Sequence, residues 1–199
     1  MLSSADKLQK RIFDIVLSAV GICMTWWLML VAWIVASFET KSNGLFMQER
    51  IGKEGKPFFV YKIKTMKPVK GIETTVTTSE DSRITTSGAF FRKTKIDELP
   101  QLFNVLFGTM SFVGARPDVP GFADKLEGEE RVILELPPGI TGPASLKYKN
   151  EEELLSKQKD PERYNKEVIW PDKVEINKMY MKHWSLKKDI NYMIKTILG

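Results

Sequence analysis

The stretch IVLSAVGICMTWWLMLVAWIVASF, residues 15–38, decides the architecture because it contains no charged side chain. An α-helix over this stretch would be about 36 Å long at ~1.5 Å per residue, which exceeds a hydrocarbon core of about 30 Å. A secretory signal peptide is the alternative. Its apolar core would be shorter, however, and Glu39-Thr40-Lys41 is a poor cleavage site. We therefore predict that residues 1–40 form an N-terminal helix embedded in a membrane.

Both flanks of this stretch are basic. A simple spanning helix has an excess of lysine and arginine on one side only. Here basic residues occur on both sides: Lys7, Lys10 and Arg11 before the stretch, and Lys41, Arg50, Lys53 and Lys56 after it. We therefore expect a re-entrant helix, which enters and leaves the membrane on the same, cytoplasmic face.

The composition limits the chemistry of the remaining residues. Charged residues make up 28% of the 199, so the chain is not a multi-span membrane protein. The net charge of +5 suits phosphates, anionic lipids or nucleic acid without choosing between them. Cys23 is the single cysteine and His183 the single histidine, which excludes an intrachain disulfide and argues against zinc. Any metal is therefore expected to be a hard ion held by oxygen.

Beyond residue 40, the pattern predicts an α+β fold that is mainly helical with a short β element. Residues 58–61, Phe-Phe-Val-Tyr, are typical of a short strand, and residues 67–82, rich in Thr, Ser and Lys, indicate a surface loop. No long Gly/Ser linker interrupts the chain. We therefore expect residues 41–199 to form one integrated cytoplasmic catalytic domain.

Helices are predicted where apolar residues recur at helical spacing. Leu99 to Leu106 follow this spacing and Gly108 ends the helix. Residues 149–167 are highly charged and indicate an exposed helical segment, and Pro171 opens a helix that runs through residue 181. Residues 184–198 form a basic amphipathic pattern. This last helix suits either the membrane surface or packing on the core, and both readings stay open.

Residues 95–106, KIDELPQLFNVL, carry the strongest candidate for chemistry. Pro100 is tolerated only in the first turn of a helix, which puts Asp97 and Glu98 at or beside the helix N-terminus, with Asp97 as a reasonable N-cap. Asp97, Gln101 and Asn104 then share one polar stripe, and we expect this face to be open. The helix N-terminus would keep Asp97 ionised and help to hold a phosphate. Acidic residues are common in a first helical turn, so this pattern alone does not establish catalysis.

Cationic residues surround this acidic pair in the sequence. Arg116 stands between the turn glycine Gly114 and Pro117, a setting that suits a rigid phosphate clamp. Others alternate along the predicted strand or lie in the polar loop. A carboxylate pair among cations suits phosphoryl chemistry, where charge is neutralised and a metal is bridged. The candidate phosphate ligands are Arg92, Arg116, Lys62, Lys64 and Arg83.

These segments resemble the bacterial sugar transferases, which are small, monotopic phosphoglycosyl transferases. The resemblance rests on residues 95–106, followed by 108–117, GTMSFVGARP. Further motifs occur in the same order, and together they extend from about Lys10 to the C-terminus. These motifs are Gln48–Gly52, Tyr61–Met66, Asp81–Thr85 and Pro138–Gly142.

The resemblance implies a two-step reaction. In the family, the Asp of an adjacent Asp-Glu pair, here Asp97 and Glu98, attacks the β-phosphate of a UDP-sugar, releases UMP and forms a phosphosugar-aspartyl intermediate. Undecaprenyl phosphate then attacks this intermediate. The resemblance also implies Mg²⁺ near Asp97, with the Glu assisting the acceptor or the metal. Gln101, Asn104 and Pro117 are expected to support the site.

The resemblance further implies where the protein works and with what. The expected partners are a UDP-sugar, a polyprenyl phosphate and the membrane, with no nucleic acid, and a homodimer stays open. The expected location is the cytoplasmic face of the bacterial inner membrane, in the first membrane step of a surface-glycan or glycoprotein pathway.

The chain departs from the family pattern in two places. The family's membrane helix is usually broken by a Ser-Pro pair, but no proline occurs here before Pro57. A re-entrant bend would need another cause, such as Gly21 or Ser18. Family members also often carry an aromatic residue after Gly-Ile-Thr-Gly, where this chain has Pro143. The identity of the sugar therefore does not carry over.

Three other functions would use some of the same features. A Mg²⁺-dependent phosphatase or pyrophosphatase acting on a lipid-linked substrate would use the same carboxylates and cations, with water as the acceptor. A non-catalytic membrane anchor or scaffold for glycan assembly would need the apolar helix alone. A nucleic-acid binder has only the net charge in its favour.

Overall fold

The computed structural model describes residues 2–67 and 81–198, apart from the side chain of residue 152. The chain forms two compact units whose segments alternate along the sequence. Unit 1 comprises Met1–Val16, Glu49–Phe58 and Val105–Gly199, and unit 2 comprises Leu17–Gln48 and Phe59–Asn104. These units do not follow the expected boundary at residue 40. The expected boundary divides a membrane-embedded part from an aqueous part, whereas the two units are defined by contacts within the protein. The boundary at residue 40 therefore stays a prediction.

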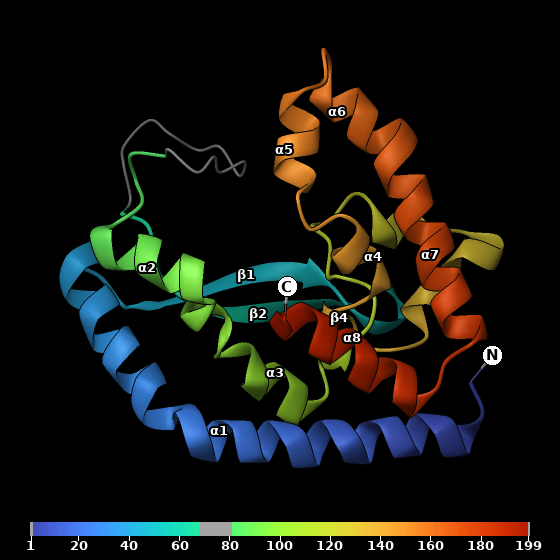
Figure 1. Ribbon diagram of the computed structural model, residues 1–199, viewed down its shortest axis with the longest axis horizontal. Helices are drawn as coiled ribbons and strands as arrows, with labels where there is room; N and C mark the ends of the chain where they lie inside the picture. Colours follow the sequence, from blue (N-terminus) through green and yellow to red (C-terminus); the bar gives the residue numbers. More distant parts are fainter. Residues whose placement is uncertain (1, 68–80, 199) are drawn as a thin grey trace. The chain divides into compact units, whose positions relative to one another are not determined.

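The predicted α+β class is confirmed, with helices accompanied by two short two-stranded sheets (Figure 1). The α-helices are α1 (Ser4–Thr40), α2 (Thr86–Thr94), α3 (Gln101–Phe107), α4 (Pro143–Lys147), α5 (Glu151–Ser156), α6 (Pro161–Tyr164), α7 (Trp170–Lys182) and α8 (Leu186–Leu198). The strands are β1 (Leu45–Ile51), β2 (Pro57–Ile63), β3 (Ser111–Val113) and β4 (Gly139–Thr141). Short helical turns are η1 (Lys53–Gly55), η2 (Ile96–Glu98), η3 (Ala123–Lys125), η4 (Gly128–Leu134) and η5 (Asn165–Ile169).

The N-terminal helix α1 is continuous over 37 residues and is long and apolar enough to cross a membrane. Only 17% of its most apolar window is buried within the protein, whereas a core helix of a soluble protein would be mostly buried. The Thr25 hydroxyl donates a hydrogen bond to the Gly21 carbonyl at 2.7 Å, a contact that favours bending in helices. The re-entrant topology itself stays a prediction.

Unit 2 is built on the second half of α1. Ala32 and Ala36 are buried with Ile63 of β2 and Phe91 of α2. Because alanine is small, α1 approaches β2 and α2 closely along this stripe. The predicted strand is confirmed, since residues 58–61 lie in β2, which pairs with β1. Residues 68–80 of the predicted surface loop lie outside the described residues.

Unit 1 contains the parallel pair β3 and β4, with Ser111 opposite Gly139 and Val113 opposite Thr141. One apolar cluster lies around β3 and α7 and another around η4 and α7. The predicted helices at residues 171–181 and 184–198 are confirmed as α7 and α8. So is the helical character of residues 149–167, which form α5, α6 and η5.

The amphipathic helix α8 packs on unit 1 through one face only. Asp189 is buried on this face, and Tyr192 and Met193 pack against the cluster around β3. Other apolar side chains of α8 stay exposed, namely Ile190, Ile194, Ile197 and Leu198. Packing on the core is therefore observed, and the exposed apolar side chains leave membrane contact as a prediction.

Candidate active site

The carboxylate pair lies in η2, a single helical turn between α2 and α3 in unit 2. Lys95 ends α2 in the left-handed conformation, with φ of 58°, and so redirects the chain before Asp97. Helix α3 begins only at Gln101, so the prediction that Asp97 caps this helix is wrong. Pro100 instead lies between the turn and the helix, where its missing N–H removes no helical hydrogen bond.

The expected open polar face is also wrong, because the whole stripe is buried. Asp97 is 8% exposed, Gln101 4% and Asn104 1%. The Asn104 side-chain amide donates to the Phe59 carbonyl at 2.7 Å and accepts from the Tyr61 amide at 3.1 Å. Asn104 therefore fastens α3 to the β2 backbone and supports the site structurally, because strand residues 59 and 61 take up its polar groups.

The attachment of β2 brings Lys62 to the carboxylate pair. Its ammonium group lies 3.0 Å from Glu98 Oε1, and both side chains are largely buried. The described contact of Lys62 is thus an ion pair with Glu98, where the sequence predicted a phosphate ligand. The two roles are compatible, since an ammonium group has three donors.

Burial raises the pKa of Asp97 above its ordinary value, and the adjacent Glu98 raises that pKa further. Lys62, Lys95 and Arg92 lower it and so offset part of the effect. The sequence predicted the opposite direction, from a helix N-terminus holding the ionised form. Asp97 Oδ1 is fully buried and finds no hydrogen-bond partner within residues 2–67 and 81–198. An ionisable oxygen left unpaired in this way costs stability and invites a functional explanation.

Two arginines of unit 2 have different partners. Arg92 contacts the segment after β2, and Arg83 pairs with an aspartate two residues before it. Arg92 Nε donates to Thr65 Oγ1 at 3.1 Å, and its Nη2 lies 3.6 Å from Met66 Sδ. Arg83 pairs with Asp81 at 2.6 Å, which lowers the pKa of Asp81 to about 2. Arg92 acts electrostatically on Asp97, whereas Asp81 engages the Arg83 guanidinium.

Two further lysines of unit 2, Lys64 and Lys95, differ in their relation to the carboxylate pair. Lys64 lies just beyond β2 and donates to Ser42 Oγ at 2.9 Å. Lys95, which the sequence did not rank as a ligand, is exposed and acts on Asp97. The sequence could have indicated this role, because Lys95 stands two residues before Asp97. The structure thus brings Arg92, Lys62 and Lys95 to the carboxylate pair, and gives Lys64 and Arg83 other contacts.

The carboxylate pair fits a Mg²⁺ site that substrate helps to complete. No group of three or more Asp, Glu, His or Cys side chains suitable for a metal occurs in the described part of the chain. A dedicated protein cage is therefore not built there. Mg²⁺, however, is commonly held by one or two carboxylates together with water and substrate phosphates. The unpaired Asp97 Oδ1, next to Glu98, offers such a ligand set.

The remaining predicted residues, Arg116 and Pro117, lie in unit 1. Arg116 is exposed, and the Pro117 carbonyl accepts from Arg50 Nη1 at 3.3 Å. Gly114 is not a turn glycine, since its φ is not positive. A glycine is required at position 114 because the backbone of Gly139 lies directly against it. A side chain at either position would collide with the backbone of the other. Arg116 therefore follows a rigid β3–β4 junction.

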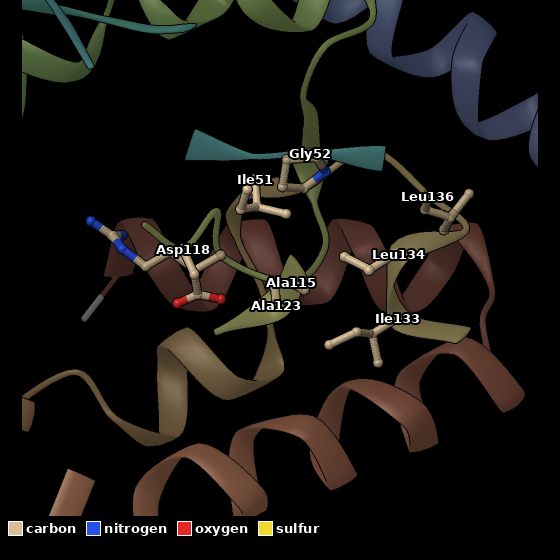
Figure 2. A pocket seen from close by; sticks show the side chains of 10 residues that line it. Ile51, Gly52, Ala115, Asp118, Ala123, Ile133, Leu134 and Leu136 are labelled. Carbon is tan, nitrogen blue, oxygen red and sulfur yellow. The ribbon is translucent and has the colours of Figure 1, made fainter. Parts of the chain in front are cut away.

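A small pocket of unit 1 lies next to this junction (Figure 2). Its labelled aliphatic side chains include Ile133, Leu134 and Leu136, and the Asp118 carboxylate lies toward the other end. Burial raises the pKa of Asp118 to about 6, although Lys173, Arg50 and Arg116 act in the opposite direction. The sequence did not single out Asp118, since its burial depends on residues far away in the chain.

The family model described as "Bacterial sugar transferase" matches residues 5–199. The chain belongs to the bacterial sugar transferase family. This match covers both units and includes the carboxylate pair, so the predicted family is confirmed.

Curated relatives of the chain carry names with three different sugars. A Bacillus subtilis (strain 168) protein, provisionally named an undecaprenyl-phosphate N-acetylgalactosaminyl 1-phosphate transferase, is 42% identical over 60% of this chain and 68% of its own length. The UDP-glucose:undecaprenyl-phosphate glucose-1-phosphate transferase of Klebsiella pneumoniae is 30% identical over 98% of this chain and 41% of its own length. The undecaprenyl-phosphate galactose phosphotransferase of Salmonella typhimurium (strain LT2) is 31% identical over 96% and 40%, respectively. The chain thus spans about two fifths of the latter two relatives.

Proposed function

We propose that the chain transfers a sugar 1-phosphate from a UDP-sugar to undecaprenyl phosphate, with Asp97 as the nucleophile. The observation that carries this proposal is the buried Asp97 carboxylate, whose Oδ1 has no hydrogen-bond partner in the described part of the chain. Lys62, Lys95 and Arg92 act on it electrostatically. The names of the relatives supply the donor and the acceptor, since all three refer to undecaprenyl phosphate and one to UDP-glucose.

The first step is attack of an Asp97 carboxylate oxygen on the β-phosphorus of the UDP-sugar. The bond from this phosphorus to the oxygen bridging the two phosphates breaks, and UMP leaves with the electron pair. Burial and the neighbouring Glu98 raise the pKa of Asp97, which makes the ionised carboxylate a better nucleophile than one in water. The surrounding cations offset the negative charge that accumulates on the phosphoryl oxygens.

The second step is attack of a phosphate oxygen of undecaprenyl phosphate on the same phosphorus. The bond between phosphorus and Asp97 breaks, and the carboxylate is restored. Lys62 holds Glu98 by an ion pair, so Glu98 is oriented next to the reacting carboxylate and can assist the acceptor. Asp97 and Glu98 would also hold Mg²⁺, which supplies further neutralisation of phosphate charge when bound.

We infer that α1 anchors this chemistry at the cytoplasmic face of the inner membrane, where a polyprenyl phosphate is available. The exposed apolar side chains of α1 and its length support an embedded helix. The exposed isoleucines of α8 and its lysines, Lys187, Lys188 and Lys195, suit the surface of an anionic membrane.

Purified protein in lipid nanodiscs, supplied with Mg²⁺, undecaprenyl phosphate and a UDP-sugar, tests the proposed function. We expect equal amounts of UMP and of a glycolipid that carries sugar 1-phosphate. Products of water attack without any glycolipid would favour the hydrolase instead. No reaction with UDP-glucose, UDP-galactose or UDP-N-acetylgalactosamine would favour the non-catalytic scaffold.

A further inference from the structure

Glu39, in the last turn of α1, makes contacts that the proposed reaction does not explain. Its carboxylate accepts hydrogen bonds from the backbone amide of Ser87 at 3.3 Å and from the Ser87 hydroxyl at 2.5 Å. Ser87 lies in the first turn of α2, 48 residues further along the chain. All of these residues belong to unit 2.

These contacts make Glu39 a cap for α2 that is supplied by another helix. The first amides of a helix have no partner within it, and a carboxylate there also interacts favourably with the helix dipole. Thr85 satisfies the Gly88 amide at 2.9 Å from within the same segment. Glu39 satisfies the neighbouring Ser87 amide, so the start of α2 is fastened both to its own loop and to α1.

The other end of α2 carries Arg92, whose backbone carbonyl accepts a hydrogen bond from the amide of Lys95, the residue at which the turn that holds Asp97 begins. Arg92 is also one of the cations that act on Asp97. The same helix also packs on α1 near its C-terminal end, since Phe91 is buried with Ala32 and Ala36. Arg92 itself contacts Thr65, whose carbonyl accepts from the backbone amide at position 85. The contacts of α2 with α1 and with the segment after β2 therefore determine where the Arg92 guanidinium lies.

We propose that Glu39 is a positioning residue for the transfer: it fastens the first turn of α2 to the end of α1 and thereby holds Arg92 beside Asp97. This inference rests on the proposed function. It assigns to the end of the apolar helix a role in catalysis besides anchoring. Any change at this end of α1 would reach the reacting carboxylate through α2.

The test compares Glu39→Gln with wild type in a single-turnover measurement of UMP release at saturating UDP-sugar. The substitution keeps the size of the side chain and one acceptor oxygen but removes the negative charge, so the hydrogen bonds from Ser87 and the interaction with the α2 dipole are weakened. We expect about a tenfold slower release, since small displacements of a catalytic group cost this much or more. Glu39→Asp should recover part of the rate. Glu153→Gln, which alters an exposed glutamate of unit 1, is the matched control and should react like wild type.

A double-mutant comparison with Arg92→Lys shows whether Glu39 acts through Arg92. If it does, Glu39→Gln should slow the Arg92→Lys protein by less than about twofold, because the group it positions is already altered. A tenfold loss in both backgrounds would contradict positioning through Arg92. So would a Glu39→Gln protein as fast as wild type. Ser87→Ala removes only the shorter hydrogen bond, and it answers the same question should Glu39→Gln not fold.

The outcome separates this inference from the function on which it rests. Wild type that releases UMP and forms glycolipid, together with an unaffected Glu39→Gln protein, would overturn the positioning role alone. Wild type that forms neither product would overturn both. A lower thermal unfolding midpoint with an unchanged rate per folded molecule would assign Glu39 to stability and contradict positioning.

Discussion

Two buried aspartates of the chain are paired very differently. Asp189 of unit 1 has a side chain that is 1% exposed, and Lys10 lies 2.6 Å from it. It also accepts hydrogen bonds from Tyr180 at 2.8 Å and Trp184 at 3.0 Å. Asp97 of unit 2 is similarly inaccessible, yet its Oδ1 has no partner among the described residues.

This difference distinguishes a carboxylate that stabilises the fold from one that can form a new bond. Burying a charge is tolerated when a counter-ion and hydrogen bonds satisfy it, and Asp189 meets both conditions. Asp97 is surrounded by charges at longer range but keeps one oxygen available for a new bond. Substitutions at the two aspartates and at neighbouring charges should therefore have different effects on activity and on stability.

The largest effect is expected for Asp97→Asn. Because the amide is not a nucleophile, turnover should fall by at least about 10³-fold. Stability should be unchanged or slightly higher, since the substitution removes a buried charge with an unpaired oxygen. Glycolipid formation and thermal unfolding, measured on the same preparation, check both parts. Full retention of activity would contradict the role of Asp97.

Asp189→Asn should behave in the opposite way. Removing one partner of the buried ion pair leaves Lys10 uncompensated, so the free energy of unfolding should fall by about 3 kcal/mol. The rate per folded molecule should change by less than about threefold. Chemical unfolding in detergent gives the first value and active-site titration the second. A stable protein with a thousandfold slower reaction would reverse the assignment of the two aspartates.

Lys62→Gln should shift the pH dependence of the reaction. In the proposed reaction Asp97 attacks only when ionised, and Lys62 lowers the pKa of this carboxylate. Without Lys62 that pKa rises further, so the acidic limb of kcat/KM should move to higher pH. Initial rates measured between pH 5 and 9 check the direction, with Lys157→Gln, an exposed lysine of unit 1, as the control. A shift to lower pH would be inconsistent with the electrostatics of the site.

The smallest effect is expected for Asp118→Asn in unit 1. The pKa of Asp118 is raised from 3.8 to about 6, so the folded state binds more protons between these values. The unfolding free energy therefore falls as the pH rises through this window. The substitution removes that cost and should stabilise the protein by about 1 kcal/mol at pH 8, since partial exposure weakens the effect, and by almost nothing at pH 4. Unfolding curves at both pH values measure the difference, and a loss of stability at pH 8 would contradict it.

The sequence predicted the elements whose pattern is local. The apolar run became α1, the residues before Lys62 became β2, and Gly108, with φ of +85°, follows the end of α3. The resemblance and the adjacent charges also selected Asp97 and Glu98. Each of these signals is contained within a few turns or a short strand, so no knowledge of distant contacts was needed.

The sequence failed where the answer depends on distant partners. The polar stripe was expected to face solvent. The residues adjacent to Asn104 in the sequence do not reveal that its side chain bonds to strand residues 43 and 45 positions away. The same strand also brings Lys62 to Glu98, the residue next to Asp97. Likewise, Gly114 reads as a turn glycine until Gly139 is brought against it. Local patterns predict elements, but the burial of a charge is decided by what packs on it.

The most direct test of the account is intact-protein mass spectrometry after exposure to UDP-sugars and Mg²⁺ without acceptor. The donors are UDP-glucose, UDP-galactose and UDP-N-acetylgalactosamine, which carry the three sugars that the names of the relatives print. We expect a mass increase of one sugar phosphate, located on Asp97, absent from Asp97→Asn and lost when polyprenyl phosphate is added. Active protein that forms glycolipid without ever carrying this adduct would contradict Asp97 as the nucleophile.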